Sequence, residues 1–191
     1  GLIHGIHEWF EMFLIIHKHL ATEPGHWYIS PLRLCLLASS FLLLLVFGST
    51  LIAGSTKPFL QRKMMLTIII IWMAGLILVE LTQSNSNKRI IAVDVYTRYA
   101  LAIPGAALTT WGLILQRKKF NQAGMKNIGR DVSVAAIAFG LYGGIGQLFT
   151  SSSAIFPSVY LNANVFINWF GFPIQAFRGL MACIAAVFII R

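Results

Sequence analysis

Six apolar runs, most of them near the length that crosses a lipid bilayer, constrain this chain more than any other feature. They cover about residues 1–16, 31–54, 64–83, 91–116, 132–150 and 172–190 of the 191 residues. A helix needs about 20 mostly apolar residues to cross the hydrocarbon core, and short connections place consecutive helices antiparallel. We therefore predict an all-α integral membrane protein with about six transmembrane helices in an antiparallel bundle.

The balance of apolar and charged residues excludes several classes of protein. The chain is 57% hydrophobic and 11% charged, whereas an ordinary soluble domain is about 45–50% apolar and about 25% charged. Too few charges are available to cover a soluble globule of this size. The sequence thus argues against a soluble enzyme, a disordered tail and a nucleic-acid partner, and predicts membrane lipid as the surroundings. Without a fixed-period repeat or a second domain, residues 1–191 form one membrane-embedded domain.

The net charge of +9 is interpreted as a topology signal. The basic residues gather in segments 55–63 and 117–130 and at Arg191, and short cytoplasmic loops carry such an excess. Loops 17–30, 84–90 and 151–171 then face outside, and both termini are cytoplasmic. Because the first run lacks a beginning, we expect the chain to be a fragment of a longer protein.

Four polar residues of the first run form one stripe. His4, His7, Glu8 and Glu11 are spaced i, i+3, i+4 and i+7, which places them on one helical face. Imidazole and carboxylate groups hold divalent metals such as Zn, Fe or Cu. The same stripe also fits a proton relay or a polar seam to another helix. Heme is less favoured, because all histidines precede residue 27 and the other runs offer none as a second axial ligand.

A second polar set is spread over the later runs. It consists of Glu80, Asp94, Arg98, Gln147, Gln175 and Arg178. Ionisable groups at membrane depth are costly and mark functional sites, so we predict ligand binding or a proton relay here, with fixed interhelical ion pairs as the alternative. Asp94 and Arg98 are spaced to pair on one helix. Arg178 is expected to pair with Glu80 or with a carboxylate of the first run.

Loop 151–171 has an unusual composition, with aromatic residues alternating with Ser and Asn. This composition fits a segment lying at the level of the lipid headgroups. It also fits a lid over a pocket.

Glycine and proline indicate where helices approach and bend. Gly140 and Gly144 have the GxxxG spacing that permits close helix packing, either inside the bundle or at a dimer face. Pro104–Gly105 and Pro173 predict bends in the fourth and sixth runs.

Three stretches together resemble a known family. They are HGIHEWFEMF, RYALAIPGAALTTWGLILQRKKF, and AFGLYGGIGQLF followed by FPSVYLNANVFINWFGFPIQAFRGLMACIAAVFIIR. This combination is similar to the multi-span N-terminal sensor region of bacterial membrane sensor histidine kinases, which is also joined to diguanylate cyclases. The resemblance implies a homodimer in the bacterial inner (cytoplasmic) membrane. It also implies that the last helix continues into a cytoplasmic kinase or cyclase output domain of the same chain.

Three functions stay open at this point. The first is a ligand- or metal-sensing input domain of a sensor histidine kinase, the second a metal- or heme-binding membrane subunit of a redox complex, and the third a small transporter or channel. No Walker loop, HExxH or GxSxG motif occurs in the sequence, so we assign no catalytic residue within it. Any enzymatic activity would belong to the parent protein.

The polar stripe of the first run generates a test. If it is a ligand site, His7→Ala abolishes metal binding or the signal response without unfolding the bundle. Elemental analysis of the purified protein measures the metal, and thermal unfolding measures the bundle. Loss of expression without a selective loss of the response would instead identify the stripe as a structural seam.

Overall fold

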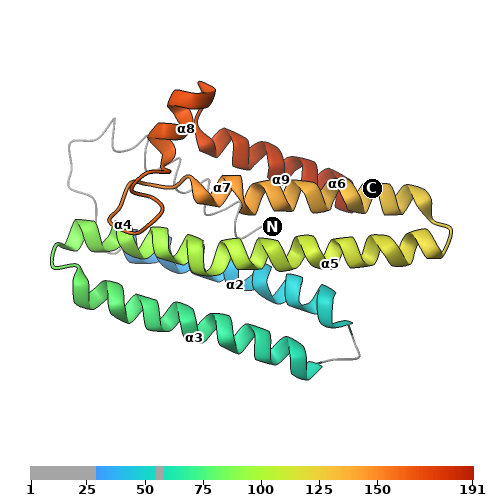
Figure 1. The fold of residues 1–191 in the computed structure, drawn as a ribbon, viewed down its shortest axis with the longest axis horizontal. Helices are drawn as coiled ribbons and strands as arrows, with labels where there is room; N and C mark the ends of the chain where they lie inside the picture. The colour runs from blue at the N-terminus through green and yellow to red at the C-terminus, as the bar shows by residue number, and fades with distance from the viewer. Residues whose placement is uncertain (1–28, 55–57) are drawn as a thin grey trace.

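A computed structural model describes residues 29–54 and 58–191, which form an antiparallel bundle of helices (Figure 1). The helices are α2 (Ile29–Ala53), α3 (Pro58–Thr82), α4 (Ser86–Thr97), the π-helix η2 (Arg98–Ala102), α5 (Ile103–Gln122), α6 (Lys126–Gly143), α7 (Ile145–Leu148), α8 (Ala163–Phe170) and α9 (Ile174–Ile190). No β-strand occurs in these residues; a single bridge joins Thr150 to Asn162.

The predicted membrane helices agree with the structure at the level of fold class. Four helices are long and apolar enough to cross a membrane, and a fifth span results if α8 and α9, bent by 82°, are one broken span. The predicted run 1–16 lies outside the described residues. The all-helical architecture of the described residues is therefore confirmed, with four or five helical segments that could span a membrane, whereas the number six stays a prediction.

The longest helix carries an irregular turn in its middle. Residues Ser86–Gln122 form 37 continuous helical residues, about 55 Å at 1.5 Å per residue. Near Pro104, where the sequence predicts a bend, the structure has the π-turn η2, in which the Ile103 N–H bonds to the Arg98 carbonyl five residues earlier. Since Pro104 has no N–H to donate, the wider turn just before it accommodates the missing bond. Single π-turns of this kind often lie at functional sites.

Helix α5 is the centre of the bundle, and one of its faces packs against α2. Gly105 lies so close to α2 that a Cβ on it would meet the Leu45 nitrogen at 3.3 Å. On the opposite side of this contact, a Cβ on Gly48 would lie 2.6 Å from the Thr109 nitrogen. The absence of side chains at these glycines lets the two backbones approach, as small residues do between membrane helices.

The other face of α5 packs against α6 through a second set of small residues. A Cβ on Gly143 would overlap the methyl group of Ala106, and one on Gly140 would lie 3.5 Å from the Thr110 hydroxyl. Gly140 therefore contacts α5 inside the bundle, as one of the two interpretations of the GxxxG spacing predicted. Its predicted partner Gly144 follows the last residue of α6 and would meet only the Gly140 carbonyl, so the second glycine at this contact is Gly143.

Helix α3 lies at the edge of the bundle and is mostly exposed. Only 6% of the most apolar stretch of α3 is buried inside the bundle. Lipid would therefore cover most of the surface of this helix. Two hydrogen bonds hold it to α4: Trp72 Nε1 donates to Thr97 Oγ1 at 3.2 Å, and the Tyr96 hydroxyl donates to the Ile71 carbonyl at 2.7 Å. Gly75 makes room for the ring of Tyr96.

Eight of the thirteen Lys and Arg residues in the described part of the chain lie at one end of the bundle, to the right in Figure 1. This end contains the α3 N-terminus, the α5–α6 turn and the C-terminus. Its basic residues are Arg62, Lys63, Arg117, Lys118, Lys119, Lys126, Arg130 and Arg191. We call it the basic end, and its opposite, where α7 ends and α8 begins, the α8 end.

The close contact of α5 with α6 generates a second test. Gly143→Ala should destabilise the bundle by about 1–3 kcal/mol, because overpacking of a tight contact forces backbone shifts. The loss is measured by thermal unfolding in detergent. Gly179→Ala is the matched control, since nothing lies within 4 Å of its added methyl group.

A rescue variant identifies the cause of this loss. Ala106→Gly removes the methyl group that the new side chain would strike, so it should restore much of the stability lost in Gly143→Ala. Equal stability losses in Gly143→Ala and Gly179→Ala would contradict the close contact.

Candidate functional site

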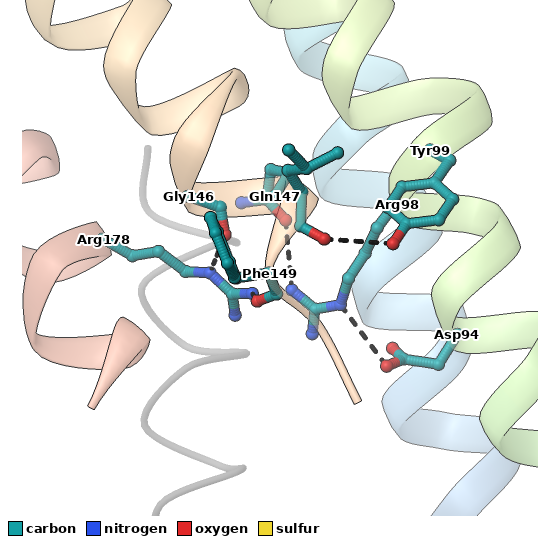
Figure 2. Close-up of polar contacts among 8 residues, drawn as sticks. Asp94, Arg98, Tyr99, Gly146, Gln147, Phe149 and Arg178 are labelled. Carbon is teal, nitrogen blue, oxygen red and sulfur yellow. Dashed lines mark hydrogen bonds and ion pairs between the residues drawn. The ribbon is translucent and has the colours of Figure 1, made fainter. Parts of the chain in front are cut away.

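A cluster of polar side chains lies inside the apolar bundle near the α8 end (Figure 2). It consists of Asp94 on α4, Arg98 on η2, Gln147 on α7 and Arg178 on α9, and we call it the polar centre. The exposed fractions of these residues are 5%, 2%, 0% and 4%. Helices far apart in the sequence thus bring their polar groups together in a region shielded from solvent.

Arg98 links two of these residues. Its Nε donates to Asp94 Oδ2 at 3.4 Å, and its Nη1 donates to Gln147 Oε1 at 3.2 Å. The pairing of Asp94 with Arg98 expected from their spacing is therefore confirmed. Arg98 is the first residue of η2, so the π-turn begins at the residue that joins α4 to α7.

Arg178 binds the backbone where α7 ends. Its Nε donates to the Gly146 carbonyl at 2.5 Å, and its Nη2 donates to the Phe149 carbonyl at 3.0 Å. Nearby, the Tyr99 hydroxyl donates to the Leu148 carbonyl at 3.0 Å. The last carbonyls of a helix lack partners within it and carry a partial negative charge. A guanidinium and a phenol supply donors at this place.

Two atoms of the polar centre keep unused hydrogen-bonding capacity. Within the described residues, Asp94 Oδ1 and Gln147 Nε2 are buried and have no hydrogen-bond partner. One is an acceptor and the other a donor, and they belong to the two side chains that Arg98 joins. A buried polar group without a partner costs about 1–3 kcal/mol. The polar centre therefore has one unused acceptor and one unused donor.

The other two residues of the predicted set lie elsewhere. Glu80 is exposed and forms an ion pair with Arg89 at 2.6 Å. Gln175 is exposed on the first turn of α9. The expected pairing of Arg178 with Glu80 is wrong, because Glu80 lies on the peripheral helix α3 and pairs with Arg89 at the start of α4. The alternative partner, a carboxylate of the first run, lies outside the described residues.

The predicted metal ligands His4, His7, Glu8 and Glu11 also lie outside the described residues. Among residues 29–54 and 58–191, no group of three or more His, Cys, Asp or Glu side chains is placed to hold a metal ion. All histidines of the chain lie within residues 1–26, so the metal and heme hypotheses stay predictions.

Several contributors to the site were not expected from the sequence. The carbonyls of Gly146, Leu148 and Phe149 are backbone groups, so no residue type signals their role. Tyr99 follows Arg98 directly, and its hydroxyl contact could not be inferred from spacing. The glycine-rich fifth run predicted only close helix packing, and not the hydrogen bonds that these carbonyls accept.

No protein-family model, curated protein or solved structure matches this chain. The resemblance to sensor regions therefore stays an expectation. What can be argued about function must come from the residues of the polar centre and their neighbours.

Two ion pairs of the chain provide a matched test of burial. Asp94→Ala leaves Arg98 buried without its carboxylate and should lower the free energy of unfolding by about 3–5 kcal/mol. Glu80→Ala removes an ion pair whose side chains are 35% and 58% exposed, and should cost at most about 1 kcal/mol. Thermal or denaturant unfolding in detergent measures both.

The N–O distances alone would predict the opposite order of stability losses, because the Glu80–Arg89 pair is shorter than the Asp94–Arg98 pair. Similar losses of unfolding free energy in the two variants would mean that solvent screens the Asp94–Arg98 pair as strongly as it screens an exposed ion pair. The polar centre would then not be a closed, low-dielectric site.

Proposed function

We propose that this chain is the membrane-embedded signal-input domain of a sensor histidine kinase. A small polar ligand binds at the polar centre, and the last helix passes the change to a cytoplasmic output domain. The observation that carries the proposal is the pair of unpartnered buried atoms, Asp94 Oδ1 and Gln147 Nε2, at the junction of α4, α7 and α9.

The chemistry of these two atoms defines the ligand. Asp94 Oδ1 accepts a hydrogen bond and Gln147 Nε2 donates one, so the proposed ligand carries both a donor and an acceptor. A hydroxyl, a carboxylic acid or an amide has both, and a water molecule is the smallest occupant. Ionisable residues within spans are costly and usually serve a function, which favours a bound ligand over a purely structural role.

The contacts of Arg178 give the ligand a route to the last helix. Gln147 lies within α7, and Arg178 of α9 binds the carbonyls of Gly146 and Phe149 on either side of it. A ligand that reorients Gln147 therefore acts on the backbone that Arg178 holds. A signal requires the ligand to bind two helix arrangements with different affinity, and a difference of one or two kcal/mol changes their ratio by about 5–30-fold.

The orientation of the domain follows from the distribution of charge. With the basic end in the cytoplasm, the polar centre lies toward the outer half of the bacterial inner membrane. The C-terminus of α9 then emerges on the cytoplasmic side, where an output domain is joined. A homodimer is expected by analogy with two-component kinases.

The reading frame of the gene tests the proposed function directly. Sequence beyond Arg191 should encode a kinase or a diguanylate cyclase domain that continues from α9. A stop codon directly after Arg191 would contradict the proposal, whatever the polar centre binds.

A variant of α9 tests the proposed route. In the full-length protein, Arg178→Gln should change the autophosphorylation rate by about tenfold, because charged hydrogen bonds worth about 1.5–3 kcal/mol are lost. Leu180→Ala is the control, since Leu180 lies two residues away and is 57% exposed.

Size-exclusion chromatography and thermal unfolding establish that both variants are folded. Arg178→Lys keeps the charge but offers a single donor group, so its rate should lie between those of the wild type and Arg178→Gln. A folded Arg178→Gln protein with the wild-type rate and response would overturn the route through Arg178.

A further inference from the structure

The segment that follows α7 has no charge and a concentration of exposed aromatic side chains. Residues 132–177 contain no Asp, Glu, Lys or Arg. Within this stretch, Phe156 is 76% exposed, Tyr160 71% and Trp169 64%. A water-facing loop of a soluble domain carries polar or charged residues, whereas Trp and Tyr gather where a membrane meets water.

Some polar groups of this segment bind one another, whereas Ser151, Ser152, Asn164 and Asn168 are exposed together with the aromatic side chains. Asn162 begins α8 by accepting hydrogen bonds from the Asn164 and Val165 N–H groups. The buried Ser158 hydroxyl donates to the Ile155 carbonyl at 2.7 Å. Backbone and hydroxyl groups satisfied in this way tolerate the low polarity near the hydrocarbon.

The direction of α8 fits a helix lying in the plane of the membrane. It is bent by 82° from α9, and Gly171, in the left-handed conformation with φ of 76°, forms the corner. If α9 crosses the bilayer, α8 runs along its surface. Figure 1 shows α8 at the end of the bundle, turned away from the direction of α9.

One side of α8 packs inward and the other is uncovered. Phe166 is 1% exposed and contacts Phe149 with ring centroids 5.2 Å apart. Ile167 and Phe170 are 43% and 55% exposed. On α9, the apolar side chain of Leu180 is 57% exposed.

We propose that α8 and loop Thr150–Asn162 form a surface that inserts into the boundary between headgroups and acyl chains at the α8 end of the bundle. The partner is the lipid interface itself, because the surface is uncharged and rich in exposed apolar and aromatic side chains. This anchor fixes the depth of α9, and thereby of Arg178, about one helical turn below it. It holds whether or not the polar centre binds a ligand.

Spin-label accessibility of the full chain in phosphatidylcholine vesicles tests the anchor. With the two exposed cysteines removed (Cys35→Ala and Cys183→Ala), single labels are placed at Phe156→Cys, Tyr160→Cys and Ile167→Cys. Oxygen, which partitions into lipid, and a water-soluble nickel complex then report the depth of each label. All three labels should lie about 5–10 Å below the headgroup surface, with little difference among them.

Two control labels calibrate the depth. Lys88→Cys lies at the exposed start of α4 at the same end and should be reached by nickel, whereas Leu180→Cys should be reached by oxygen. Because the surface has no charge, added anionic phosphatidylglycerol or higher salt should leave the three depths unchanged.

Other results would overturn the anchor. Nickel access at all three positions equal to that at Lys88→Cys would place the surface in water. Protection from both reagents would mean that protein covers it, as in contact with a second copy or closure as a lid. Depths that change along further labels on α8 by about 1.5 Å per residue would make α8 part of a spanning helix.

Discussion

The carbonyl groups at the end of α7 need hydrogen-bond donors, because no water is available inside a bilayer to satisfy them. The rest of the α8 end is arranged around this requirement. Arg178 supplies two donor groups from α9, and Tyr99 supplies a hydroxyl from η2. These hydrogen bonds thus cap the end of α7 and join η2, α7 and α9, which are distant in the sequence. The same contacts place two guanidinium groups in the polar centre.

Close packing of α5 makes this arrangement rigid. Glycines at its contacts with α2 and α6 bring the backbones together, where dispersion and weak polar contacts act over short distances. η2 continues directly into α5, so Arg98 is held by the best-packed helix of the described chain. Helix α3 packs less extensively against the other helices than α5 does. Because most of its residues would face lipid, it is the least constrained of the long helices. The polar centre therefore lies on the side of α4 and α5 that packs inside the bundle.

The candidate site was predictable only in part. Asp94 and Arg98 pair because they are spaced i, i+4 along one continuous helix, and this spacing is visible in the sequence. Glu80 and Gln175 were grouped with them because each lies in an apolar run near the same end, and the structure separates both from the polar centre. Whether a polar side chain in a span points inward depends on helix rotation, which neighbouring helices set and spacing alone does not.

The sequence by itself determined the all-helical class, the long apolar helices and the concentration of basic residues at one end. These follow from composition and run length, because a bilayer admits few solutions for an apolar chain of this kind. Only the tertiary structure decided that Gly140 and Gly143 face α5, that Gln147 meets Arg98, and that Arg178 binds backbone carbonyls instead of Glu80. Each of these contacts joins segments whose relative position comes from packing, and a carbonyl group is identical in every residue of the sequence.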